Sequence, residues 1–82
     1  MKISSVINAN HSAATEIQAL MKQGWRNDGE KLTQFGFEIY PVCSKKFDRT
    51  KFVCRNAQGY VAADSPMLAL NLLISILENK WD

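Results

Sequence analysis

The segment at residues 64–78, DSPMLALNLLISILE, constrains the fold of this chain more than any other. Ser65 followed by Pro66 is a typical helix start, because a serine hydroxyl accepts a free backbone N–H and proline fits the first helical position. With residues placed at about 100° each, the apolar ones cover well over half of the circumference. A helix lying on a sheet needs an apolar arc of about 100° or somewhat more. The segment therefore requires packing partners beyond a sheet.

One flank of this helix carries apolar side chains that packing on a sheet does not explain. The residues of this flank are Leu68, Leu72 and Ile76. Either the first helix of the chain covers them, or they form a seam with a second copy of the chain or with another partner. The sequence leaves these alternatives open and makes the three residues candidates for a dimer or partner seam.

A second amphipathic helix is expected over residues 13–23, and its apolar positions are Ala13, Ile17, Leu20 and Met21. Asn10 and Ser12 are both candidates to cap its start. Gly24 is expected to end it, since glycine adopts the left-handed conformation at low cost. The first residues, KISSVI, are compatible with a short strand or an early helical turn.

Three strands are expected between the helices, at residues 32–44, 50–56 and 60–63. In the first, Phe35, Phe37 and Ile39 are predicted to share one face, with Glu38, Tyr40 and Val42 on the other. In the second, Phe52 and Cys54 are predicted to share a face, with Lys51, Val53 and Arg55 opposite. Pro41 cannot donate to a ladder, so its strand should lie at an edge or carry a bulge there. Residues 26–31 are expected to form a loop.

This element order predicts an α+β fold of one domain over residues 1–82. The expected architecture is α-β-β-β-α, a three-stranded antiparallel sheet with two helices packed on one face. Two helices side by side would each need an apolar arc that reaches both the sheet and the neighbouring helix. That requirement explains part of the wide arc of the last helix.

The residues that carry enzymatic or metal chemistry are few and scattered. His11 is the only histidine and is expected to be a polar residue in the first helical turn. Cys43 and Cys54 are expected to be buried thiols that point inward, since they are too few for a disulfide scaffold and do not have zinc-site spacing. The carboxylates form no pair and no glycine-rich phosphate loop is present. We therefore expect no enzyme, no catalytic residue, no metal and no cofactor.

The location of the chain is expected to be the cytoplasm. No run typical of a signal peptide is visible in MKISSVINANHS. The longest apolar stretch, at residues 67–77, is too short to span a bilayer and is interrupted by Asn71 and Ser75. The sequence therefore predicts no membrane association.

The strongest charge feature is the expected hairpin at residues 45–55, KKFDRTKFVCR. Its net charge is +4 and that of the other residues is −2, which gives the chain its +2. The candidate partner-binding residues in it are Lys45, Lys46, Phe47, Arg49, Lys51 and Arg55. Cations with an interleaved aromatic ring bind nucleic-acid phosphates and bases, or dock into an acidic protein groove around an aromatic anchor. A hairpin kept soluble by its charge is the third interpretation.

The order α-β-β-β-α resembles that of a double-stranded RNA-binding domain. LMKQGW, the following strands and ADSPMLALNLLISILE carry this resemblance. The lysine-rich motif that would engage phosphates at the start of the last helix of that family is SPMLAL here, without a basic residue. The resemblance therefore extends to the fold, and RNA binding does not follow from it.

The C-terminal half, GYVAADSPMLALNLLISIL, is similar to small phage or prophage accessory proteins of the ABA-sandwich kind. The matching residues are Ala62, Ala63, Ser65, Pro66, Ala69, Leu70 and Leu77. This resemblance implies a protein without catalytic residues that binds a host factor, as anti-CRISPR proteins of similar size do. The expected function is that of a stoichiometric inhibitor or adaptor of a bacterial host or defence protein. The alternative is a small nucleic-acid-binding module that uses the basic hairpin on phosphates.

Overall fold

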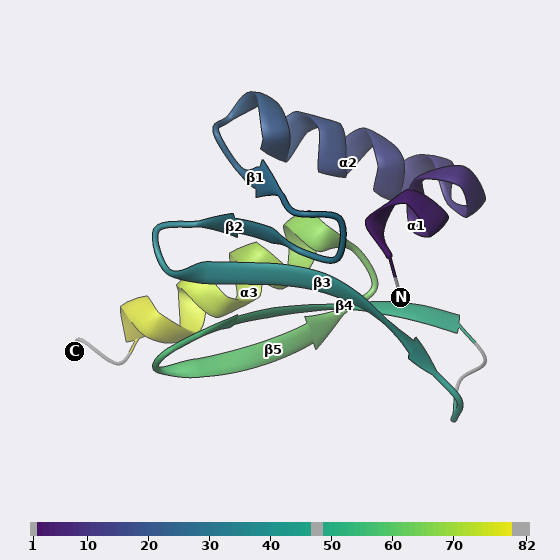
Figure 1. Cartoon of the computed structure of the whole chain (residues 1–82). Coiled ribbons are helices and arrows are strands. Elements are labelled where there is room, and N and C mark those ends of the chain that lie inside the picture. Colours follow the sequence, from purple (N-terminus) through teal and green to yellow (C-terminus); the bar gives the residue numbers. More distant parts are fainter. Residues whose placement is uncertain (1, 47–48, 80–82) are drawn as a thin grey trace.

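The structure is a computed structural model that describes residues 2–46 and 49–79. This part of the chain forms an antiparallel sheet with strand order β1-β2-β3-β4-β5 and three helices (Figure 1). The helices are α1 (Ile3–Ala9), α2 (His11–Lys22) and α3 (Pro66–Asn79). The strands are β1 (Arg26–Asn27), β2 (Leu32–Gln34), β3 (Phe37–Ser44), β4 (Arg49–Asn56) and β5 (Gly59–Ala63). The α+β class is as predicted, but the sheet has five described strands and not three.

The predicted strand at 32–44 is a hairpin, because the chain reverses at Phe35 and Gly36. Both residues have positive φ angles, 53° and 83°, as a two-residue hairpin turn with the correct twist requires. Strands β2 and β3 then pair with Leu32 opposite Ile39. The side chain of Phe35 is 90% exposed at this turn, so the expectation that it shares a face with Phe37 and Ile39 is wrong.

The segment expected as a loop at residues 26–31 contains the edge strand β1 and a tight turn. Arg26 pairs with Thr33 of β2. The turn is held by Asp28, whose side chain accepts hydrogen bonds from the backbone N–H groups of Glu30 and Lys31 at 3.1 and 2.9 Å. These bonds hold the pKa of Asp28 below its usual value.

The N-terminal segment is helical, the second of the two expected alternatives. Helix α1 is followed by Asn10, whose side chain accepts the backbone N–H of Ala13 at 3.1 Å and caps α2. Helix α2 ends before Gly24, where φ is 104°. The N–H groups of Gly24 and Trp25 donate to Met21 and Leu20 at 3.1 Å, the paired bonds of a Schellman ending. The expected stop at Gly24 is confirmed.

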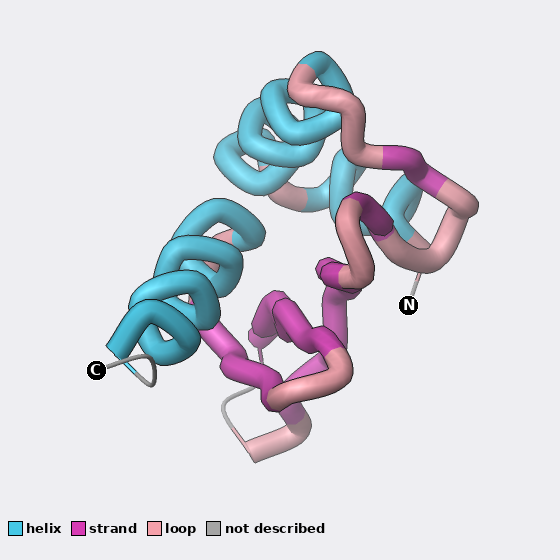
Figure 2. The backbone as a smooth tube through the Cα atoms, turned by 90° about the vertical axis from the view of Figure 1, so that its left-hand side faces the viewer, coloured by secondary structure: helices cyan, strands magenta, loops and turns pink. Residues whose placement is uncertain are grey.

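The core lies between one face of the sheet and the helices (Figures 1 and 2). The strands contribute Leu32, Ile39, Phe52, Cys54 and Ala63, which are all buried. The helices contribute Ile3, Val6, Ile17, Leu20, Ala69 and Leu73. The predicted common face of Phe52 and Cys54 is confirmed.

Helix α3 packs on β3, β4 and β5 and contacts α2. Its start is capped twice. The Ser65 hydroxyl accepts the backbone N–H of Leu68 at 3.1 Å, as predicted, and the carboxylate of Glu16 in α2 accepts that of Met67 at 2.9 Å. The second cap fixes the start of α3 against α2, and a carboxylate there also complements the helix dipole.

No described helix covers the other face of the sheet, which we call the open face. Its central residues, set by strand alternation and register, are Glu38, Tyr40, Val42, Arg49, Lys51, Val53, Arg55, Tyr60 and Ala62. At one end of this face β2 stops short: its pairing with β3 reaches only Ile39, so Pro41 has β4 as its one registered neighbour. The expectation that the strand of Pro41 lies at an edge is wrong, because β3 pairs with β2 on one side and with β4 on the other. Pro41 itself lies beyond the end of the β2 pairing, where proline is tolerated.

Candidate binding surfaces

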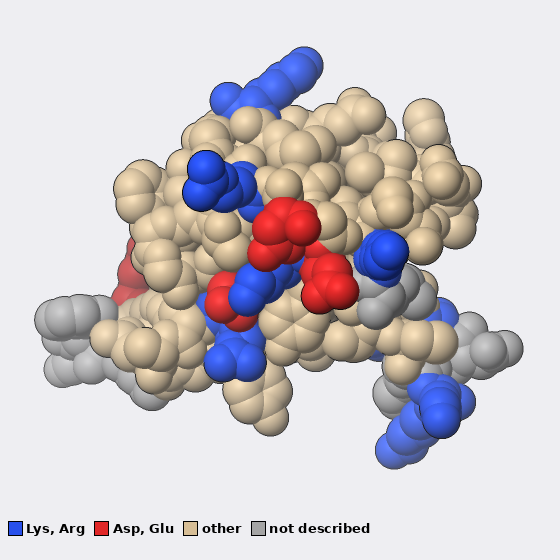
Figure 3. Space-filling view, viewed as in Figure 1, with Lys and Arg blue, Asp and Glu red and all other residues tan. Residues whose placement is uncertain are grey.

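The basic residues of the predicted hairpin are spread along its length in the structure. Lys45 and Lys46 are exposed near its end, where Figure 3 shows basic side chains gathered away from the body of the molecule. Arg49, Lys51 and Arg55 instead lie along β4 on the open face. The predicted contact residue Phe47 lies outside the described residues.

Arg49 and Lys51 share one carboxylate, that of Asp64, which follows β5. Lys51 Nζ lies 2.6 Å from Asp64 Oδ1, while the nearest nitrogen of Arg49 is 3.6 Å from the same oxygen. The hydrogen bond from Lys51 and the charge of Arg49 hold the pKa of Asp64 below its usual value. Asp64 is therefore shared by two cations of β4.

Arg55 belongs to a second cluster, at the opposite end of β4. Glu38 in β3 accepts a hydrogen bond from Lys31 at 3.0 Å, and Arg55 Nε lies 3.8 Å from its other oxygen. This cluster again joins two cations to one carboxylate, and Asp28 and Glu30 also lie close to Lys31. Figure 3 shows basic and acidic side chains side by side over the middle of this face.

The open face carries two tyrosines. Tyr40 and Tyr60 line a shallow hollow of about 450 Å³ together with Arg55 and the β4–β5 turn. The side chain of Tyr60 is 74% exposed. Tyr40 was predicted on the strand face that it shares with Glu38 and Val42, but sequence reasoning assigned a functional role to neither tyrosine. The sequence signal that could have identified them is a tyrosine on the outer face of a strand that neighbours a strand rich in lysine and arginine.

The predicted flank of α3 is exposed in the structure. Leu68, Leu72 and Ile76 are 46%, 42% and 45% exposed. They are four residues apart and therefore form one stripe along the helix, which we call the α3 stripe. Helix α1 packs on α2 and β3, and α2 contacts α3, but neither covers the stripe. Its binding role stays a prediction.

The two thiols differ in exposure. Cys54 is buried as expected, and burial raises the pKa of its thiol to about 11, which keeps it protonated. Cys43 is exposed, so its expected inward burial is wrong. Both are free, because Cys43 pairs with Thr50 and not with Cys54. His11 is exposed at the first position of α2, and no metal-binding group of three His, Cys, Asp or Glu side chains occurs in the described ranges.

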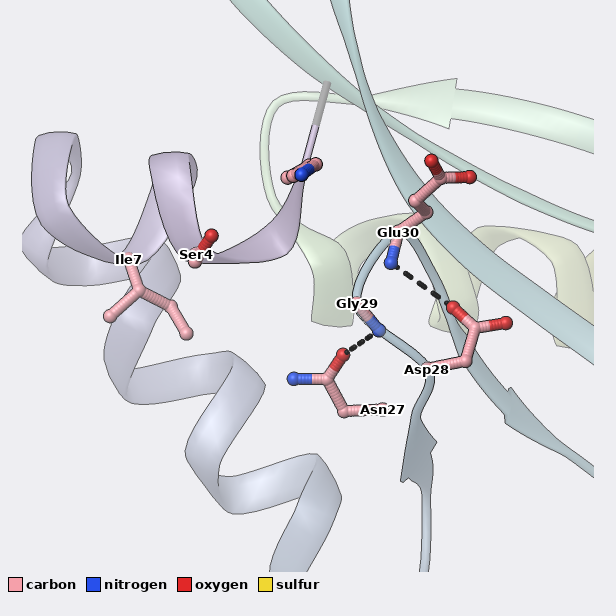
Figure 4. Close-up of a pocket in the computed structure, with 7 residues that line it drawn as sticks. Ser4, Ile7, Asn27, Asp28, Gly29 and Glu30 are labelled. Carbon is pink, nitrogen blue, oxygen red and sulfur yellow. Dashed lines mark hydrogen bonds between the residues drawn. The ribbon is translucent and has the colours of Figure 1, made fainter.

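A further hollow of about 500 Å³ lies between α1 and the β1–β2 turn (Figure 4). Two of the polar side chains that line it, those of Asn27 and Asp28, serve the turn. The side-chain oxygen of Asn27 accepts the N–H of Gly29 at 2.8 Å, and that of Asp28 accepts the N–H of Glu30 at 3.1 Å. These oxygens are used within the turn, and we assign this hollow no binding role.

Comparison of the chain with protein-family models, with curated proteins and with solved structures finds no match. None of the described helices has the length and hydropathy that crossing a membrane requires. The candidate surfaces therefore have to be interpreted from their own chemistry.

Proposed function

We propose that this chain is a non-enzymatic binding protein that docks the α3 stripe into an apolar groove of a partner protein, as a stoichiometric inhibitor or adaptor. The observation that carries the proposal is the exposure of Leu68, Leu72 and Ile76 along one helix. Exposed apolar side chains that form a continuous strip are characteristic of protein–protein contact sites.

The chemistry of α3 favours a protein groove over a charged ligand. From Pro66 to Leu77 the helix contains no charged residue, so its outer surface loses little hydration energy when it is buried. Ile74, which is 37% exposed, lies on the other side of the polar strip of Asn71 and Ser75 and is not part of the stripe. Helices that present apolar anchors at intervals of three to four residues are recognised by hydrophobic grooves.

The helix is also held firmly enough to present the stripe in one orientation. On its inner side Ala69 and Leu73 are buried in the core, and its start is capped by Ser65 and Glu16. Binding then requires little ordering of the helix, which lowers the entropic cost of association.

The available area favours a groove over a second copy of the chain. A standard interface buries about 800 Å² on each partner. The three stripe residues, each less than half exposed, supply well under that amount. A groove that also contacts the sides of the helix buries more area than a second, equally convex helix.

The test is a comparison of proteins retained from bacterial lysate by immobilised wild-type chain and by two variants. Leu72→Lys places a charge in the middle of the α3 stripe, and Gln18→Lys places the same charge on an exposed position of α2. We expect a protein that binds wild type and Gln18→Lys but not Leu72→Lys, with one-to-one stoichiometry when it is purified and titrated.

Two results would contradict the proposal. One is that nothing is retained above a bare-resin control, and the other is that Leu72→Lys retains the same proteins as wild type. Circular dichroism spectra of the three proteins should coincide, because both substituted side chains are exposed. If the spectrum of Leu72→Lys alone differs from that of wild type, the same comparison is made with Leu68→Lys.

A further inference from the structure

We infer that the open face of the sheet is a binding site for single-stranded nucleic acid, on which Tyr40 and Tyr60 stack bases and Arg55 contacts the backbone. This site is separate from the α3 stripe and does not depend on the protein-binding function proposed above. It rests on three properties of the open face: the placement of its aromatic rings, its charge and its shape.

The register of the sheet places both tyrosines around Arg55. Tyr60 in β5 pairs directly with Arg55 in β4, and Tyr40 in β3 pairs with Val53, the residue two positions before Arg55 on the same face. All three residues line the hollow of about 450 Å³. The site therefore combines two rings held on strands with a guanidinium group, which can pair with a phosphate or stack on a base.

The exposure of Tyr60 is the feature that most favours a stacking ligand. Its side chain is 74% exposed although it lies on a paired strand. A ring in this position contributes little to the core of the protein. It offers a flat π surface to any base, and base–aromatic stacking tolerates all four bases because each has a π face.

The cations of the open face are arranged along one strand. Two clusters of cations around a carboxylate lie at opposite ends of β4, on either side of Val53. In each cluster a lysine makes the short contact to the carboxylate, at 2.6 or 3.0 Å. The arginine lies farther away and its side chain is more than half exposed, 55% for Arg49 and 57% for Arg55. The guanidinium group of Arg55, which lines the hollow with both tyrosines, is therefore the cation placed to meet a phosphate.

The shape of the face selects a single strand. The bases of a duplex are stacked on one another and are not available to a ring on a flat sheet, whereas the bases of a single strand can be splayed out and stacked on aromatic side chains. No described helix rises from this face to enter a groove of a duplex. The surface also has the mixed apolar and basic character of stacking platforms, with Val42, Val53 and Ala62 between the charged clusters.

The test measures fluorescence anisotropy of a labelled 15-nucleotide dT strand and of the corresponding dA·dT duplex at low salt. We expect the wild-type chain to bind the single strand more tightly than the duplex. Tyr60→Ala should weaken binding of the strand about 5-fold or more, the effect of losing one base stack. Tyr60→Phe, which keeps the ring, should bind within about 2-fold of wild type.

Salt dependence separates the role of Arg55 from that of the rings. Arg55→Ala should reduce the slope of log affinity against log salt by about 0.7, the value for one phosphate contact on a single strand. Tyr60→Ala should leave that slope unchanged. Phe35→Ala serves as a control for loss of an exposed ring, because Phe35 lies at the β2–β3 turn and not on the open face; it should bind as wild type does.

Several outcomes would overturn this site. They are no anisotropy change at low salt, tighter binding of the duplex, or equal binding by wild type and Tyr60→Ala. A protein partner that is lost on Tyr60→Ala while the oligonucleotide fails to bind would assign the open face to protein recognition and refute the inference. Leu72→Lys should bind dT as wild type does, so failure of this site and failure of the α3 stripe are distinguishable.

Discussion

The thiol of Cys54 is fully buried between the sheet and α3. Burial disfavours the thiolate and raises its pKa from 9.0 to about 11. Between these two pH values the unfolded chain has lost this proton while the native chain retains it, so deprotonation favours unfolding. We expect the free energy of unfolding to fall from pH 9 to pH 11, with Cys54 contributing on the order of 2 kcal/mol of that loss.

Urea unfolding at pH 7, 9 and 10.5 measures this contribution. Cys54→Ala removes the group, so its free energy of unfolding should fall less over this pH range than that of wild type. Cys43→Ala is the matched control, because it makes the same substitution at an exposed thiol. Equal pH dependence in wild type and Cys54→Ala would contradict the assignment.

Phe35 occupies a backbone conformation that suits another residue better. Its φ angle is 53° in the two-residue turn between β2 and β3, a region where asparagine is favoured and bulky residues are rare. The side chain makes little packing contribution, since it is 90% exposed. We expect Phe35→Asn, which creates the preferred Asn-Gly turn, to raise the free energy of unfolding by roughly 0.5–1 kcal/mol.

Thermal unfolding followed by circular dichroism measures this gain as a rise in Tm of a few degrees for a chain of this size. Gly36→Ala tests the same turn in the opposite direction. The φ angle of Gly36 is 83° and no atom lies within 4 Å of an added Cβ, so the expected loss of stability comes from backbone strain alone. A lower Tm for Phe35→Asn than for wild type would argue against this turn geometry.

Helix α3 has no acidic residue in its first turn and no basic residue in its last turn. Its stability therefore depends on side-chain capping at its start more than on charges that complement the helix dipole. Ser65→Ala removes the side-chain acceptor for the Leu68 N–H. We expect this change to lower the free energy of unfolding by about 1 kcal/mol. The measurement is urea unfolding at pH 7.

Ser75→Ala is the control for this prediction, since it makes the same substitution at an exposed interior position of α3. Its effect should be neutral or slightly stabilising, because alanine has the higher helix propensity. Equal effects of the two substitutions would show that the Ser65 hydroxyl does not cap the helix.

The start of α3 and the end of α2 were predictable because local chemistry sets them. A serine before proline and a glycine after an amphipathic run satisfy backbone groups within a few residues. The break at Phe35 was not predictable in the same way, because only Gly36 gives the usual turn signal and phenylalanine is rare at positive φ. Cys43 shows a similar limit. Strand alternation places its side chain on the same face as Ile39. Alternation does not show where along the strand the helices stop covering that face, and Cys43 is exposed.

At the scale of the whole molecule, the α+β class follows from the order and periodicity of the segments. The candidate sites follow only in part, because they depend on which strands become neighbours. Arg55 and Tyr60 are brought together by the β4–β5 pairing, and Asp64 reaches the cations of β4 from the end of β5. Charge counted along the hairpin therefore overstates its basic character, since acidic residues from other segments lie against it.

The α3 stripe leads to the last prediction, which concerns the oligomeric state of the isolated chain. The exposed side chains of the stripe supply less area than the roughly 800 Å² per partner of a stable interface. We therefore expect a monomer of 9.3 kDa by size-exclusion chromatography with light scattering at concentrations of about 10 μM. Leu72→Lys should have the same mass. A dimer at this concentration that Leu72→Lys converts to a monomer would identify a second copy of the chain as the occupant of the stripe, in place of the groove of a partner protein.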